Sequence, residues 1–156
     1  MMTLTNKVVS LWSPVDKILS SLIPLADLTA RLYIAKVFFM SGWSKITDWE
    51  TTLWLFEEEY KVPLLPTELA AYMATAGELL LPVLLVIGFL TRFAATGLFI
   101  LNIVAVISYY TTLQSSPAAL QDHLQWGIIL AMLATAHVKY ITIDNFLERK
   151  LTSNGN

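Results

Sequence analysis

Charged side chains inside long apolar stretches are the residues of this sequence that could do chemistry. Lys36 lies in the apolar stretch 25–46, and Glu78 lies in the stretch 67–90. An isolated charge in a bilayer costs about 2.5–3.5 kcal/mol on insertion scales, so opposite charges at one depth are expected to pair. On antiparallel helices that rise ~1.5 Å per residue, each charge lies ~16 Å from one end, close to the midplane. We therefore predict that Glu78 pairs with Lys36 or with Arg31.

Pro82 adds a backbone acceptor at the same level. A proline cannot donate a hydrogen bond to the carbonyl of residue i−4, which here belongs to Glu78, so the helix kinks and this carbonyl is freed. Lys36, Arg31, Asn102 or a water molecule could then donate to it. A Lys36–Glu78 pair could be a structural bridge, a site for an anionic or quinone-like headgroup, or part of a proton relay.

A second polar layer is predicted nearer the cytoplasm. Asp27 and Arg31 are i,i+4 neighbours on a helix face that continues to Gly42 and Lys45, and His137 falls at a depth similar to that of Arg31. Arg31 therefore has two candidate partners. The simpler interpretation is that Asp27 neutralises an arginine that snorkels towards water.

The two histidines do not form a metal site. His123 and His137 lie ~21 Å apart along one helix, so they cannot ligate one ion. His123 could bind a cation weakly beside the acidic residues 57–59, although a solvated acidic face is the simpler interpretation. No nucleophile with a base, phosphate loop or dinucleotide motif is present. We predict no metal.

Composition identifies the class of protein. Of the 156 residues, 56% are hydrophobic and 14% are charged, whereas soluble domains have roughly 45–50% and about 25%. A net charge of −2 without a basic run gives no footprint for nucleic acid. The absence of cysteine excludes disulfides, iron–sulfur clusters and Cys-zinc sites. A bilayer is therefore the expected partner.

The apolar stretches predict an all-α membrane protein, an antiparallel bundle of four transmembrane helices. The four predicted spans run from about Leu25 to Ile46, Thr67 to Leu90, Arg92 to Leu113 and Leu120 to Ile141. Residues 1–24 are predicted to be an interfacial amphipathic segment, with Pro24 resetting the direction of the chain, and residues 148–156 are predicted to be a cytoplasmic tail. Residues 47–66 carry aromatic and acidic side chains and are predicted to form a surface helix and loop, with the helix a lid over the outer mouth of the bundle.

The distribution of basic residues predicts the orientation. With the N-terminus inside, the inner side would hold Lys7, Lys17, Arg92, Lys139, Arg149 and Lys150, and the outer side only Lys45 and Lys61. Cytoplasmic loops carry an excess of Lys and Arg. Both termini are therefore predicted to be cytoplasmic.

Four sequence segments resemble the DoxX family over residues 25–147. They are Arg31 to Lys45, which reads RLYIAKVFFMSGWSK, then Gly77-Glu78-Leu79, Gly88 to Arg92, and Asp122 to Gly127. Two positions depart from the family pattern. Ala35 stands where many members have glycine, and Thr135-Ala136-His137 replaces a glycine-rich exit from the last helix. His137 therefore inherits no family role.

The resemblance implies a four-helix, multi-pass protein of the bacterial inner (plasma) membrane. Some members are similar to the membrane subunit of thiosulfate:quinone oxidoreductase, and others are grouped with oxidative-stress or peptide-modification systems. We expect a subunit that binds a quinone or another small amphipathic molecule in a redox, detoxification or maturation system. Whether it is a quinone-linked oxidoreductase subunit or non-catalytic stays open. The alternatives are a scaffold for soluble enzymes and a small proton-coupled transporter that uses Glu78.

Site roles are assigned by residue. The candidate binding residues are Arg31, Lys36, Glu78, Asn102 and His123, and the candidate structural residues are Asp27, Gly42, Lys45, Pro82 and Arg92. No covalent cofactor is expected, and a quinone is the candidate ligand. Other protein subunits or further copies of the chain are the candidate protein partners.

Overall fold

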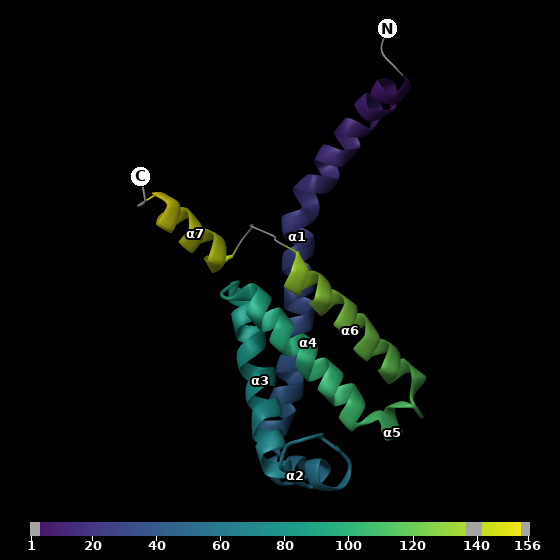
Figure 1. The fold of residues 1–156 in the computed structure, drawn as a ribbon, viewed down its shortest axis with the longest axis vertical. Coiled ribbons are helices and arrows are strands. Elements are labelled where there is room, and N and C mark those ends of the chain that lie inside the picture. Colours follow the sequence, from purple (N-terminus) through teal and green to yellow (C-terminus); the bar gives the residue numbers. More distant parts are fainter. Residues whose placement is uncertain (1–3, 137–141, 154–156) are drawn as a thin grey trace.

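The computed structural model describes residues 4–136 and 142–153, and every element in that part of the chain is a helix. The elements are α1 (Leu4–Thr47), α2 (Trp49–Glu58), α3 (Thr67–Ile87), α4 (Thr91–Ser108), α5 (Tyr110–Leu113), α6 (Pro117–Thr135) and α7 (Ile143–Ser153). Helix α1 packs chiefly on α3, and α4 packs between α3 and α6. Figure 1 shows α2 and α5 at one end of this bundle, and α7 with the first part of α1 at the other.

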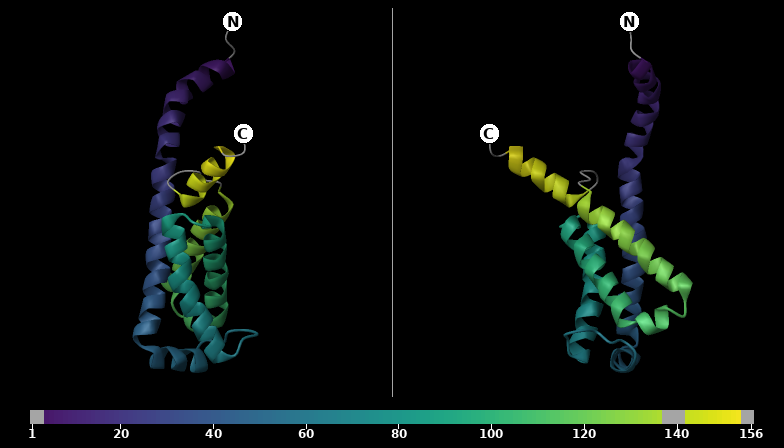
Figure 2. Two further views of the ribbon diagram at one scale, coloured as in Figure 1. Left: turned by 90° about the vertical axis from the view of Figure 1, so that its left-hand side faces the viewer. Right: turned by 45° about the vertical axis from the view of Figure 1, so that its right-hand side comes forward.

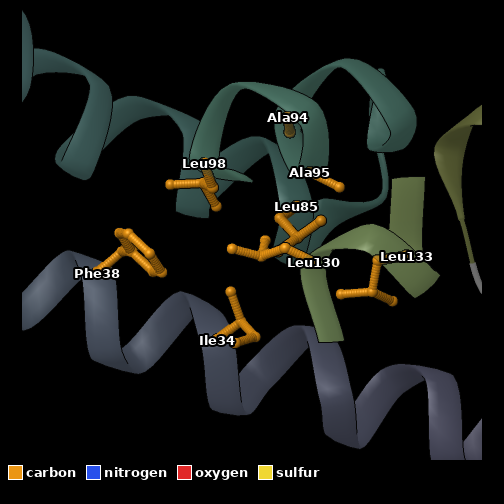
Figure 3. Packing of buried hydrophobic residues seen from close by; sticks show 8 residues of the cluster. All are labelled: Ile34, Phe38, Leu85, Ala94, Ala95, Leu98, Leu130 and Leu133. Carbon is orange, nitrogen blue, oxygen red and sulfur yellow. The ribbon is translucent and has the colours of Figure 1, made fainter. Parts of the chain in front are cut away.

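The core is formed where these four long helices meet. Its buried side chains are Ile34, Phe38, Leu85, Ala94, Ala95, Leu98, Leu130 and Leu133, which come from α1, α3, α4 and α6 (Figure 3). The small side chains of Ala94 and Ala95 on α4 fit close helix packing, which small residues favour in membrane bundles.

Within residues 4–136 and 142–153, three helices are long and apolar enough to cross a membrane. They are Leu11–Thr47, Thr67–Ile87 and Thr91–Ser108. The prediction of a membrane protein with several apolar helices is confirmed at this level. Helix α6 packs beside them but carries Gln121, Asp122, His123 and Gln125.

Helix α1 is longer than predicted. It runs without interruption through Pro14 and Pro24, so residues 4–24 and the first span form one helix and not two segments. An internal proline removes one backbone hydrogen bond and kinks a helix, but the helix can continue beyond it. The N-terminal part of α1 accordingly curves in the left view of Figure 2. An interfacial position for residues 1–24 stays a prediction.

Helix α2 confirms the predicted surface helix. Asp48 caps it by accepting a hydrogen bond from the Thr51 N–H at 3.1 Å, and Phe56 packs on Ala70 and Ala71 of α3. The ring of Tyr60 meets that of Tyr109 edge-on, with centroids 4.8 Å apart. Burial, with Tyr109 and Glu59 nearby, raises the pKa of Tyr60. This helix lies against one end of the bundle, chiefly on α3.

The ends of several helices differ from the predicted ones. Pro66, not Thr67, is the N-cap of α3, because its carbonyl already accepts from the Ala70 N–H. The third span ends at Ser108, and α6 ends at Thr135. Predicted residues 137–141 of the fourth span lie outside the described residues.

The turn between α3 and α4 requires glycine. Gly88 has a φ of 68°, and a Cβ there would lie 2.7 Å from the Cα of Thr142. Beside it, the Asp144 carboxylate accepts from the backbone N–H groups of Leu90 at 2.8 Å and Thr91 at 2.9 Å. Asp144 therefore supplies the anionic cap for the first turn of α4, and this contact docks α7.

Candidate functional site

Glu78 pairs with Lys45, so the predicted pairing with Lys36 or Arg31 is wrong. The Lys45 Nζ lies 2.6 Å from the Glu78 Oε2 and 2.9 Å from the Ser41 Oγ, to which it also donates. The two charged side chains are only 16% and 12% exposed. They form a shielded, hydrogen-bonded ion pair between α1 and α3.

Gly42 explains why Lys45 is the partner. A Cβ at Gly42 would lie 2.9 Å from the Leu79 Cγ and 3.0 Å from the Glu78 Cβ, so only glycine lets α1 and α3 approach this closely. This contact fixes the axial register of the two helices, and Lys45 lies one turn beyond it. The prediction assumed that the ends of the two spans lie at the same level. This alignment wrongly placed Lys36, and not Lys45, at the depth of Glu78.

Lys36 lies elsewhere. It is exposed, and it lines a shallow groove of about 340 Å³ with Leu32, Phe39, Pro82 and Val83 among its neighbours. Pro82 itself is buried inside a continuous α3. The proline lines the groove that Lys36 occupies, yet Lys36 takes no part in the Lys45–Glu78 pair.

The predicted contact between Asp27 and Arg31 is confirmed. The Arg31 Nε lies 2.9 Å from the Asp27 Oδ2, and the Arg31 side chain is fully buried. Its Nη1 makes long contacts of 3.4 and 3.5 Å to the carbonyls of Leu85 and Val86, in the last turn of α3. A cation there complements the helix dipole, so this residue ties α1 to the end of α3. His137, its second predicted partner, lies outside the described residues.

Arg92 has a comparable structural contact. Its Nε donates to the Ala134 carbonyl at 2.9 Å, in the last turn of α6. The arginine therefore links the start of α4 to the end of α6. Its positive charge complements the helix dipole at the C-terminal end of α6.

Asn102 and His123 form the most defined polar pair between α4 and α6. The Asn102 Nδ2 donates to the His123 backbone carbonyl at 2.9 Å, and the Asn102 Oδ1 lies 2.8 Å from the His123 Nδ1. A carbonyl only accepts, so the amide nitrogen faces it and Oδ1 faces the imidazole. The Nδ1 must then carry the hydrogen, which leaves Nε2 with a lone pair in the neutral ring.

Neighbouring residues hold this pair in place. Gly127, one turn after His123, leaves room for the amide, since a Cβ there would lie 3.3 Å from the Asn102 Nδ2. The Trp126 ring meets the His123 ring edge-on at 4.9 Å, and the Trp126 Nε1 donates to the Tyr33 Oη at 3.2 Å. The imidazole is thus fixed from α4 on one side and braced through Trp126 to α1 on the other.

The pair lies in the wall of an open groove of about 750 Å³ between α4 and α6. Most of the lining is apolar, and it consists of Phe99, Asn102, Ile103, Val106, Ile107, Pro117, Leu120, Gln121, His123, Leu124, Gly127, Ile128 and Ala131. Small-molecule sites have about 300–1,000 Å³ and combine apolar walls with a few placed polar groups. The groove suits an amphipathic ligand with a hydrogen-bonding head.

The sequence contained a signal for this partnership that the prediction did not use. Asn102 lies six residues before Ser108, where α4 ends, and His123 lies six residues after Pro117, where α6 begins. Antiparallel helices joined by a short connection bring such positions opposite each other. Among the described residues, no group of three or more His, Asp or Glu side chains could hold a metal ion.

Comparison with known proteins identifies the family of the chain. The model of the DoxX family matches residues 26–111, which covers the second half of α1, all of α2, α3 and α4, and the connections between them. An uncharacterized protein of Haemophilus influenzae is 37% identical over 131 residues, which is 78% of this chain and 83% of that protein. No solved structure matches the chain. With more than half of its residues matched, the chain belongs to the DoxX family.

Proposed function

We propose that this protein binds a quinone or another small amphipathic molecule in the groove between α4 and α6, as a membrane subunit of a redox or detoxification system. One observation carries the proposal: the Asn102–His123 pair orients an imidazole in the wall of an apolar groove. Since Nδ1 is engaged by the amide, Nε2 is the ring nitrogen left for a ligand. The ligand site that we propose therefore lies at His123, whereas the sequence alone suggested the depth of Lys36 and Glu78.

The chemistry of the ring suits a quinone headgroup. A neutral imidazole accepts a hydrogen bond from a quinol hydroxyl at Nε2, and an imidazolium donates one to a quinone carbonyl. Histidine changes charge near neutral pH, so one ring can follow the proton that quinone reduction takes up. The chain has no cysteine for an iron–sulfur cluster, and electrons would therefore come from a partner subunit.

The proposal includes a fourth membrane crossing by α6 in the bacterial inner membrane. At ~1.5 Å per residue, the helix from Pro117 to Thr135 is about 28 Å long, close to the roughly 30 Å of a hydrocarbon layer. It packs beside α4, which is itself apolar enough to span. Its charged side chain, Asp122, is exposed in the second turn, near one end of the helix, and the neighbouring His123 is hydrogen-bonded to α4.

Binding to the purified protein tests the ligand. We expect a short-chain benzoquinone to bind the protein in lipid nanodiscs, measured by titration calorimetry. His123→Phe removes one hydrogen bond, worth about 1–1.5 kcal/mol, and should weaken binding about tenfold. Gln125→Leu is the matched control, because it changes an exposed polar residue of the same helix outside the groove.

Other results would favour the alternatives. If the wild-type protein binds no quinone and instead co-purifies with soluble enzymes, the protein is a scaffold for those enzymes. If His123→Phe binds as tightly as the wild type while the quinone still binds, the groove is not the site. Proton uptake that depends on Glu78 but not on His123 would favour the transporter.

A further inference from the structure

Lys36 is an exposed cation in the spanning part of α1, and no acidic side chain in the described part of the chain pairs with it. Within the bundle, the carboxylates of α1 and α3 are already engaged, because Asp27 pairs with Arg31 and Glu78 pairs with Lys45. A charge in a spanning segment without a partner is costly, and such a residue often marks a binding site. The positive charge of Lys36 is therefore left for an anion other than these two carboxylates.

The groove that holds Lys36 is apolar and lies between α1 and α3. Besides Lys36, its lining includes Leu32 and Phe39 of α1 and Val83, Val86 and Ile87 of α3. We call this the Lys36 groove. Leu32 and Val83 are each 47% exposed, so the groove opens towards the surroundings of the bundle. Its volume of about 340 Å³ is at the lower end of the range for small-molecule sites, which suits part of one acyl chain.

Lys36 lies close to the end of the bundle at which α3 ends. Arg31 contacts the carbonyls of Leu85 and Val86 in the last turn of α3, and Lys36 follows Arg31 by five residues, or ~7.5 Å along α1. Helical side chains lean towards the N-terminus of their own helix, so the lysine stem leans back in the direction of Ile87, the last residue of α3. The ammonium group can therefore reach the headgroup level while its methylene groups stay beside the groove.

We propose that the Lys36 groove binds an anionic phospholipid from the leaflet beside the α3–α4 turn, with the phosphate on the Lys36 ammonium group and part of one acyl chain along α1 and α3. This leaflet is on the side predicted to be cytoplasmic. Basic pockets between spanning helices on that side bind acidic lipid headgroups.

Charge and depth both favour this occupant. An anionic lipid supplies the counter-charge that the chain does not give to Lys36, whereas a zwitterionic lipid brings no net charge to it. A carboxylate on the helix of a partner protein would first have to enter the hydrocarbon layer, which is costly. A phospholipid carries its phosphate at the surface that the lysine already reaches.

Native mass spectrometry of the purified full-length protein in detergent tests the proposal. The protein is mixed with equal amounts of phosphatidylglycerol and phosphatidylcholine that carry the same acyl chains, so that only the headgroups differ. We expect the wild type to retain phosphatidylglycerol in about fivefold excess, the factor expected for one lysine near an anionic headgroup. Lys36→Met should lose this preference, and Lys36→Arg should keep it because the charge remains.

Two further variants separate the groove from the effect of charge alone. Val83→Trp fills the groove without changing any charge, and the fold should tolerate it because Val83 is half-exposed. It should remove the preference as Lys36→Met does. Lys61→Met is the matched control, since Lys61 is an exposed lysine in the connection after α2, at the other end of the bundle. This variant should bind phosphatidylglycerol like the wild type.

Several results would overturn the proposal. Equal retention of both lipids by the wild type would mean that the groove selects no anionic headgroup. A preference that survives Val83→Trp, or one that Lys61→Met removes as fully as Lys36→Met, would mean that surface charge alone attracts the lipid. Co-purification of another membrane protein that Lys36→Met abolishes would assign the lysine to a protein partner. None of these results bears on quinone binding at His123.

Discussion

Several polar side chains inside the bundle have a defined partner across a helix interface. Asn102 holds His123, Lys45 holds Glu78, and Arg31 contacts the last turn of α3. Unpaired polar groups are costly in a bilayer, so each pair contributes to which helices lie side by side. Only the Asn102–His123 pair also lines a large apolar groove, which makes its imidazole different from the structural pairs.

The Lys45–Glu78 pair gives a prediction about stability. Lys45→Met should destabilise the protein in detergent, because Glu78 is left shielded without its counter-charge. Breaking a buried pair costs about 3–5 kcal/mol, and the 12–16% exposure of these side chains should lower that value. The double change Lys45→Met with Glu78→Met should recover most of the loss, since apolar replacement of a pair is often neutral. Thermal unfolding measures both.

Lys36→Met is the control for this cycle, because the same replacement is made on the same helix at an exposed position. It should change stability by no more than about 0.5 kcal/mol. A large loss for Lys36→Met that Glu78→Met rescues would contradict the pairing described here and restore the one predicted from the sequence.

At the level of helices, the sequence predicted which segments are helical better than how they align. Long apolar stretches identify spanning helices, and the shared face of Arg31, Gly42 and Lys45 follows from periodicity. The axial offset between α1 and α3 does not follow from periodicity, because it depends on the close approach at Gly42. The short connection between α4 and α6 did fix an offset, which is why Asn102 and His123 could have been paired by counting. The continuity of α1 through Pro24 could not be predicted, because a proline that kinks a helix and one that separates two segments have the same sequence signal.

Helix α7 gives a prediction about pH. Burial alone would raise the pKa of Asp144, but the hydrogen bonds from the Thr91 and Leu90 N–H groups and the Thr91 hydroxyl outweigh it, so the pKa is lowered from its ordinary value of 3.8. The stabilisation of the docked α7 is thus complete above pH 3.8 and is lost as the pH falls through the lowered pKa. Hydrogen exchange of α7 should stay slow at neutral pH and accelerate only in strong acid.

Asp144→Asn is the matched variant. Its amide nitrogen cannot accept a hydrogen bond, so α7 should exchange faster at neutral pH, while Asp16→Asn on the exposed part of α1 should leave that exchange unchanged. Loosening of α7 in the wild-type protein already near neutral pH would contradict this account, as would an Asp144→Asn variant with unchanged exchange.

At the scale of the whole molecule, the number of membrane crossings determines two things. It decides on which side of the membrane the C-terminus lies, and whether the groove between α4 and α6 lies in the hydrocarbon layer. In the described part of the chain three helices are apolar enough to span, and α6 runs beside them with its polar residues facing α4 or exposed. With Lys45 paired inside the bundle, Lys61 is the basic residue left on the outer side of the predicted arrangement. The cytoplasmic position of both termini stays a prediction that depends on the number of crossings.

The side of the membrane on which the C-terminus lies reports the number of crossings, and this side can be measured. If α6 crosses, four crossings return the C-terminus to the side of the N-terminus, and the positive-inside rule makes that side the cytoplasm. Green fluorescent protein fused after Asn156 should then fluoresce in intact cells, and alkaline phosphatase fused there should be inactive. A short tag inserted at Ser115, between α5 and α6, is the control and should be reached only from the periplasm. If α6 does not cross, three crossings place Asn156 and Ser115 on the same periplasmic side, the phosphatase fusion becomes active, and the groove between α4 and α6 no longer lies within the hydrocarbon layer.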